Sequence, residues 1–153
     1  MTARTIQIGL VGAGMFGGDV HLRTYADLQR SGIAPWLGRI GMDDYARPAA
    51  DVRFELVGIC TRTPASARRA CAEYERLTGK APLPFHGEMP WLDLMERFPN
   101  LDIVAIATPD HLHTSPALAA LERGIHVIME KPMALDIREA DAIIARAKEK
   151  GAF

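Results

Sequence analysis

The stretch IQIGLVGAGMFG, residues 6–17, joins an apolar run to a glycine-rich turn. The apolar run is typical of a buried parallel strand, and residues 17–30 have helical composition. The pattern G-x-G-x-x-G therefore falls at a strand-to-helix turn. There Gly12 permits a tight turn, Gly14 leaves room for a pyrophosphate, and Gly17 permits close packing of helix on strand. A glycine turn without a ligand is the alternative, but this context favours dinucleotide binding at the helix N-terminus.

Size, charge and cysteine content narrow the class of protein. The chain has 153 residues, 48% hydrophobic and 24% charged, with a formal net charge of −1 at pH 7. This length suits one domain, and the charge gives no reason to expect nucleic acid or an acidic membrane surface. No apolar run approaches the ~20 residues that span a bilayer, and the N-terminus leaves no room for a signal peptide. The basic pair Arg68-Arg69 is expected on a solvated helix face, and Cys60 and Cys71 lack the spacing of a disulfide framework. We expect a cytoplasmic protein with no nucleic-acid or membrane partner.

Strand-like and helix-like segments alternate along the rest of the chain. The expected strands are residues 54–60, 83–85, 102–107 and 126–129, and the expected helices are residues 65–78, 91–98, 115–124 and 136–150. We expect Ser115 and Asp136 to cap helix N-termini, and Gly79 to end a helix. The alternation predicts an α/β fold with a doubly wound parallel sheet of about five strands, in which Pro84 marks an edge strand.

Residues 31–53 do not belong to a minimal strand–helix–strand unit, because prolines and glycines interrupt them. We treat residues 1–153 as one dinucleotide-binding domain with an insertion at about 31–53. The insertion is expected to be an irregular excursion, with Trp36 and Tyr45 partly buried against a neighbouring surface. It is either a lid or subunit interface, or a family-specific loop.

The end of the second strand bears on the choice of cofactor. An NAD-preferring site usually places Asp or Glu there, to hold the ribose 2′-hydroxyl groups. Here Thr61 can donate a hydrogen bond to a 2′-phosphate and Arg62 can neutralise it, so this strand end favours NADP over NAD. An exposed loop arginine is the alternative interpretation of Arg62. Asp43 and Asp44 are closer to the usual spacing, but no strand precedes them.

Two further strand ends carry recognisable motifs. The fourth strand runs into TPDHLH, residues 108–113, and the fifth into EKPMAL, residues 130–135. With the glycine turn, they resemble the N-terminal domain of the Gfo/Idh/MocA oxidoreductases, where these ends read approximately T-P-N-H-x-H and E-K-P-x-A. Asp110 replaces the usual asparagine. The resemblance covers nearly the whole chain except residues 31–53, and it implies a Rossmann fold, NADP or NAD as cofactor, and a sugar, cyclitol or related alcohol or carbonyl as substrate.

The resemblance also implies a role for each matched position in holding the cofactor. Backbone groups of Met15 and Phe16 would join the three glycines at the pyrophosphate. The surface beneath the nicotinamide-side ribose would be formed by Thr108, Pro109 and His111.

The third motif supplies the implied catalytic residue. Glu130 would help hold the cofactor end of the cleft, and Pro132 would fix the turn that directs Lys131 towards the substrate. The Lys131 ammonium would stabilise charge developing on the substrate oxygen and relay a proton. In the resembling family, a further strand would begin at residues 151–153 and lead to a second α+β domain that builds the substrate pocket. We therefore expect this chain to be a fragment that is inactive alone, from a longer enzyme that forms a homo-oligomer.

Other interpretations of these residues stay open. A non-catalytic dinucleotide sensor or regulator could use the same fold, although it has no chemical need for Lys131. His111 and His113, with Asp110, have the spacing of a metal site, but no second ligand cluster accompanies them, and we expect no metal. His113 is instead expected to brace the start of the following helix. No partner is evident for three other histidines, His21, His86 and His126.

Overall fold

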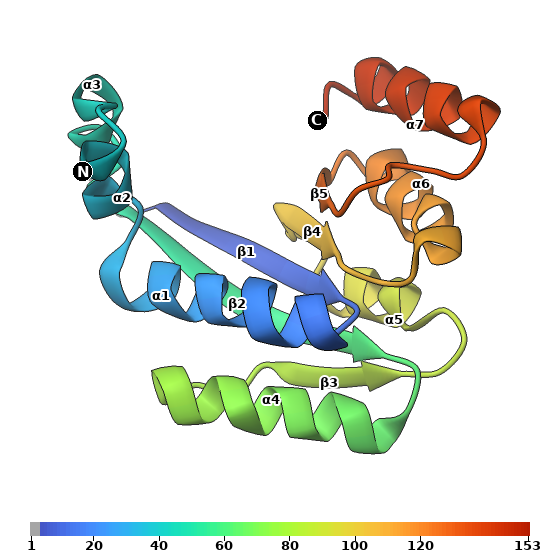
Figure 1. The fold of residues 1–153 in the computed structure, drawn as a ribbon, viewed down its shortest axis with the longest axis horizontal. Helices are drawn as coiled ribbons and strands as arrows, with labels where there is room; N and C mark the ends of the chain where they lie inside the picture. Colours follow the sequence, from blue (N-terminus) through green and yellow to red (C-terminus); the bar gives the residue numbers. More distant parts are fainter. Residues whose placement is uncertain (1–3) are drawn as a thin grey trace.

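Five parallel strands form one sheet in the computed structural model, which describes residues 4–153 (Figure 1). The strands are β1 Arg4–Val11, β2 Val52–Thr61, β3 Leu83–His86, β4 Ile103–Ile106 and β5 His126–Met129. Their order is β3-β2-β1-β4-β5, and each adjacent pair is parallel. The expected parallel α/β sheet is confirmed, and Pro84 lies on the edge strand β3.

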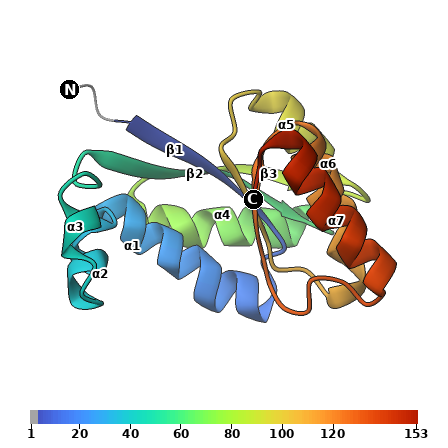
Figure 2. The same cartoon turned by 90° about the horizontal axis from the view of Figure 1, so that it is seen from above.

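Helices cover both faces of the sheet. They are α1 Arg23–Ser31, α2 Ala34–Arg39, α3 Asp43–Ala46, α4 Pro64–Thr78, α5 Pro90–Arg97, α6 Thr114–Glu122 and α7 Ile137–Lys150, with a π-helical turn η1 Gly17–Leu22 and a 3₁₀ turn η2 Asp110–Leu112. Helices α1 and α4 lie side by side against β2, whereas α5 and α6 pack on the other face and α7 packs on α6 (Figures 1 and 2). The arrangement is therefore doubly wound, as the alternation of elements predicts.

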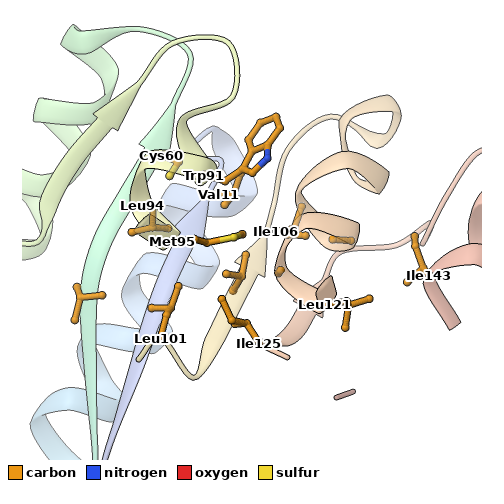
Figure 3. Close-up of a cluster of buried hydrophobic side chains, with 14 residues drawn as sticks. Val11, Cys60, Trp91, Leu94, Met95, Leu101, Ile106, Leu121, Ile125 and Ile143 are labelled. Carbon is orange, nitrogen blue, oxygen red and sulfur yellow. The ribbon is translucent and has the colours of Figure 1, made fainter. Parts of the chain in front are cut away.

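Each face of the sheet has its own hydrophobic core. Between the sheet and α5–α6, buried side chains that include Leu94, Ile106 and Leu121 form one cluster (Figure 3). Leu94 fills the space above two glycines of the sheet, since a Cβ on Gly9 would lie 2.5 Å from Leu94 Cδ2, and Gly58 is equally crowded. A second cluster, between the sheet and helices α1 and α4, is built around the fully buried Tyr74.

Most of the helix ends in the structure lie at the capping residues that the sequence indicates. The Asp136 side chain accepts a hydrogen bond from the Arg138 amide at the start of α7. Gly79 and Gly151 end their helices in the left-handed region, with φ of 74° and 65°. The prediction for Ser115 was wrong, because η2 runs almost directly into α6 and the helix begins one residue earlier, at Thr114.

The segment 31–53 also differs from expectation. It is not irregular, because α2 and α3 occupy much of it and pack mainly on each other, at the far end of the sheet from the strands' carboxyl ends (Figure 1). A proline in the first turn, as in α2, is compatible with a helix start. Of the two side chains expected to be partly buried, Trp36 is 41% exposed and Tyr45 is 64% exposed in this chain. Trp36 instead has the guanidinium of Arg39 over its ring, at 4.7 Å.

The last described residues lie against β5. The Val127 amide donates to the Phe153 carbonyl oxygen at 2.7 Å, and the Phe153 ring stacks on His126 with centroids 4.1 Å apart. His126 therefore has a partner that sequence reasoning missed. Among the helices described between residues 4 and 153, none has the length and apolar character needed to cross a membrane.

Candidate functional site

The carboxyl ends of the strands meet around β1, where the sheet order changes direction. From β1 the chain builds β2 and β3 on one side, and β4 and β5 on the other. Ligands of open α/β sheets bind at this switch point. A cavity of about 860 Å³ lies there, a size typical of small-molecule sites. Its lining includes seven of the expected cofactor-site residues: Gly12, Gly14, Thr61, Arg62, Thr108, Pro109 and His111.

The glycine turn forms one wall of this cavity. Gly12 has a φ of +96°, and a Cβ there would lie 2.5 Å from the Ala107 carbonyl oxygen, so only glycine fits. A Cβ on Gly14 would meet no atom within 4 Å, which leaves the turn open to an incoming group. A Cβ on Gly17 would overlap the Gly12 carbonyl oxygen. Gly17 therefore packs on the turn itself, rather than mainly on the strand as the sequence predicts.

The helix after this turn begins differently from the expected regular helix. Its first part, η1, is π-helical, and α1 follows only at Arg23. Two consecutive glycines, Gly17 and Gly18, begin the π-helical part, and glycine favours regular helix least among residues other than proline. Short π-helical segments are frequent at functional sites. Met15 and Phe16, at the start of this helix, are exposed and stand outside the cavity lining.

Thr108 provides an independent indication that a polar ligand fits the cavity. Its hydroxyl oxygen Oγ1 is buried and has no hydrogen-bond partner within the described part of the chain. Buried polar atoms are normally hydrogen-bonded, so this oxygen lacks a partner that a ligand can supply. With the open space at Gly14 and the turn at Gly12 that only glycine can form, the residues present fit a dinucleotide.

At the end of β2, hydroxyl groups and arginines line the adjoining part of the cavity. Thr61 Oγ1 lies 2.7 Å from Ser66 Oγ, and Thr63 caps α4 by accepting a hydrogen bond from the Ser66 amide. Arg62 and Arg69 line the cavity, and neither has an acidic partner within 4.0 Å in residues 4–153. Arg69 is exposed on α4, as the expected solvated helix face requires, and it also borders the cavity, which was not expected.

One acidic residue reaches the same cavity. Glu88, in the loop between β3 and α5, is part of the lining. The spacing after the second strand gave no indication of it, because it belongs to the end of the third. Arg62 and Arg69 therefore give this end of the cavity two positive charges, and Glu88 gives it one negative charge.

Beyond β5, Glu130 is held by a histidine from the glycine-turn helix. Glu130 Oε1 accepts a hydrogen bond from His21 Nε2 at 2.6 Å, and His21 Nδ1 lies 3.1 Å from the Tyr25 hydroxyl. The His21 hydrogen bond holds the pKa of the Glu130 carboxyl below its ordinary value, and the Lys131 backbone amide and charge act in the same direction. Burial, followed by the Glu130 charge, raises the pKa of Tyr25 to about 12.

His113 occupies the space between the turns after β4 and β5. Its Nδ1 lies 2.8 Å from the Pro132 carbonyl oxygen and its Nε2 lies 2.9 Å from the Thr108 carbonyl oxygen. His113 directly precedes α6, where it was expected to brace the helix start, but its side chain contacts the backbone of the two turns and makes no capping hydrogen bond. Lys131 is exposed, and the peptide bond between Lys131 and Pro132 is cis. Glu130, Lys131 and Pro132 stand outside the cavity lining.

Comparison with known proteins identifies the family. Residues 6–153 match the model of the Gfo/Idh/MocA oxidoreductase family, described as an NAD-binding Rossmann fold. The chain belongs to this family. The match spans nearly all the described residues, and the family's NAD-binding domain has the fold found here.

Similar proteins in this family include dehydrogenases of sugars. Over 147 residues the chain is 30% identical to levoglucosan dehydrogenase of Pseudarthrobacter phenanthrenivorans. The aligned region covers 96% of this chain and 31% of that dehydrogenase. It is 34% identical over 107 residues to an NADP-dependent D-xylose 1-dehydrogenase of Hypocrea jecorina, covering 70% of this chain and 26% of that protein. The structure of the WlbA dehydrogenase of Bordetella pertussis in complex with NADH and UDP-GlcNAcA superposes with a TM-score of 0.66 at 28% identity, over 97% of this chain and 36% of that one. The chain thus spans about a third of the length of these relatives.

The Gfo/Idh/MocA motifs indicated only part of the site. They gave the glycine turn and the ends of β4 and β5, and the position of the ribose-binding residue in dinucleotide sites gave the end of β2, but neither indicated Arg69, Glu88 or His21. A partial signal existed for Arg69, which lies on the helix that Thr63 caps. His21 has no local signal, because its partner Glu130 is 109 residues away. In residues 4–153, His, Cys, Asp and Glu side chains form no group of three that could hold a metal ion.

Proposed function

We propose that this chain is the cofactor-binding domain of an oxidoreductase that uses NADP in preference to NAD. The observation that carries the proposal is the cavity shared by the glycine turn, the end of β2 and the end of β4. In this arrangement the pyrophosphate lies over Gly12 and Gly14 at the start of η1, where backbone amides favour an anion. Met15 and Phe16 present backbone groups to the same phosphates.

The preference for NADP rests on the end of β2. A 2′-phosphate beside Thr61 would meet the unpaired guanidinium groups of Arg62 and Arg69. Glu88 opposes the phosphate, but two positive charges outweigh one negative charge at this end of the cavity. NAD, which lacks the phosphate, gains nothing from the arginines.

The other end of the cavity would hold the nicotinamide half. Thr108, Pro109 and His111 line this part of the cavity, and the Thr108 hydroxyl without a partner supports a hydrogen bond to the nicotinamide-side ribose. When bound, a nicotinamide ring takes up or gives a hydride. Lys131 projects from the neighbouring strand end, where its ammonium can stabilise negative charge on a substrate oxygen and relay a proton. Glu130 and Pro132 hold the turn that carries it.

The substrate class follows from the relatives. Several of them are named as dehydrogenases or reductases of sugars, which supports a sugar or related polyol as substrate of the whole protein. We further propose that the protein is cytoplasmic, that its full-length form is a homo-oligomer, and that it uses neither nucleic acid nor membrane as a partner. The present chain, which spans a third of its relatives, would bind cofactor without turnover.

The test is calorimetric titration of the chain with NADP⁺ and NAD⁺, for wild type and Arg62→Ala. We expect the wild type to prefer NADP⁺, and Arg62→Ala to lose about tenfold or more in NADP⁺ affinity with little change for NAD⁺, because a hydrogen bond to a charged group contributes about 1.5–3 kcal/mol. Arg68→Ala is the matched control, since Arg68 is exposed on α4 and outside the cavity lining. Equal wild-type affinity for both cofactors, or identical losses in both arginine variants, would contradict the NADP assignment.

A further inference from the structure

His113 is wholly buried, and it connects two parts of the candidate site. It lies at the start of α6, between the turn that follows β4 and the turn that follows β5. Thr108, in the first turn, lines the cavity, and Pro132, in the second, directly follows Lys131. One imidazole ring therefore lies between the proposed nicotinamide surface and the proposed catalytic lysine.

Both hydrogen-bond partners of the ring are backbone carbonyl oxygens. The distances are 2.8 Å from Nδ1 to the Pro132 oxygen and 2.9 Å from Nε2 to the Thr108 oxygen. A carbonyl oxygen only accepts hydrogen bonds, so each contact requires a proton on the ring nitrogen that faces it. A neutral imidazole can donate to one carbonyl, and an imidazolium can donate to both.

The polar contacts between the turn after β4 and the turn after β5 are made through this ring. The backbone hydrogen bonds between β4 and β5 continue as far as the Glu130 amide, which donates to the Ile106 carbonyl oxygen at 3.0 Å. Past that point, the described structure has no backbone hydrogen bond between the two turns, and they are joined by the contacts of His113 with the two carbonyl oxygens. The backbone after β4 and the backbone after β5 are thus fixed relative to each other by one side chain that is wholly shielded from solvent.

We propose that His113 is a positioning residue, which sets the separation between the Thr108 turn and the Lys131 turn. The inference rests on the proposed function, because it assigns the nicotinamide half of the cofactor to the Thr108 turn. Two turns that are already held at the correct separation lose little conformational entropy when a ligand binds. Removing the His113 contacts should therefore weaken binding of the nicotinamide half of the cofactor. The adenine half, at the end of β2, does not touch either turn and is unaffected.

Two substitutions separate the two hydrogen bonds. In His113→Asn the amide nitrogen falls near the position of Nδ1 and can still donate to the Pro132 oxygen, whereas in His113→Gln it falls near Nε2 and can donate to the Thr108 oxygen. His113→Phe keeps a ring but removes both donors. His126→Asn is the matched control, because His126 begins β5, at the opposite end of that strand.

Backbone amide NMR spectra of the 153-residue chain give the first readout. Relative to wild type, we expect His113→Asn to shift mainly the amides around Thr108, where its hydrogen bond is lost. We expect His113→Gln to shift mainly those around Lys131. If both substitutions instead disturb the same residues of α6 and leave the two turns unchanged, the bridging role is overturned.

Binding of NADP⁺ and of 2′,5′-ADP, which lacks the nicotinamide half, gives the second readout. We expect the Asn and Gln variants to lose about fivefold or more in NADP⁺ affinity and to stay within about twofold of wild type for 2′,5′-ADP, because only the preorganised turns are lost. Equal losses for both ligands, or none for either, would overturn the inference and leave the proposed function standing. A wild-type chain that binds neither ligand would instead overturn the proposed function, and the inference with it.

Discussion

Substituting Gly14 by alanine separates the binding role of the glycine turn from its folding role. A Cβ added at Gly14 meets no protein atom within 4 Å, and the residue does not have a positive φ. The folded chain can therefore accept the methyl group without strain. Replacing glycine at such a position restricts the unfolded chain and stabilises a protein by about 0.4–1 kcal/mol. At about 2–4 °C per kcal/mol, Tm should rise by no more than about 4 °C.

Binding should change in the opposite direction. The methyl group would occupy the space through which the pyrophosphate approaches the backbone amides. Losing one charge-assisted hydrogen bond, about 1.5–3 kcal/mol, raises Kd roughly 10-fold to 150-fold. Thermal denaturation and calorimetric titration with NADP⁺ measure the two effects. Gly18→Ala is the control, since its added Cβ would make one ordinary contact, 3.6 Å from the Ala13 oxygen. A Gly14→Ala chain that binds NADP⁺ as tightly as wild type would refute the pyrophosphate assignment.

Three further predictions address the core, the Glu130 contact and Lys131. Leu94→Ala removes a fully buried side chain that fills the space over Gly9 and Gly58, so unfolding should become easier by about 2–5 kcal/mol; a Tm within about 2 °C of wild type would contradict this packing. Because the pKa of Glu130 is lowered in the folded state, its contribution to stability is complete above its unfolded pKa and is lost as the pH falls through the folded value. Tm measured between about pH 6 and pH 3 should therefore fall less steeply in Glu130→Gln than in wild type, and a parallel fall would contradict the His21 contact. In a protein that includes the remaining two thirds of the relatives' length, Lys131→Met should preserve cofactor affinity and lower kcat by roughly 10²–10⁴-fold, and near-normal turnover would show that another group carries the proton.

Features of the fold that depend on neighbouring residues could be predicted from the sequence. The strand before Gly12 is recognisable because it is apolar and buried on both faces, and the glycines follow it directly. Asp136 and Gly79 mark helix ends because capping involves residues only a few positions apart. The prediction that Ser115 caps α6 was wrong because a 3₁₀ turn precedes the helix, which therefore begins at Thr114. The capping preferences of single residues do not indicate such a turn.

Features that join distant parts of the chain were beyond sequence reasoning. The His21 contact with Glu130 spans 109 residues, and although the motif singles out Glu130, nothing near it in the sequence indicates His21 as its partner. His113 was placed at the start of α6 correctly, but its two carbonyl partners come from separate turns that only the sheet brings together. Arg69 is solvent-exposed as expected, but its place beside the cavity could not be predicted, because a helical pattern shows which residues are polar and not which of them border a cavity.

The central claim is that a nicotinamide dinucleotide binds across the carboxyl ends of β1, β2 and β4. The most direct test is to follow the backbone amide NMR spectrum of the 153-residue chain during titration with NADP⁺. The account predicts saturable shifts at residues 12–18, 61–66 and 108–113, with the β-strand amides at the opposite end of the sheet unchanged. Absence of saturable shifts, or shifts confined to the α2–α3 segment or to the amino ends of the strands, would contradict it.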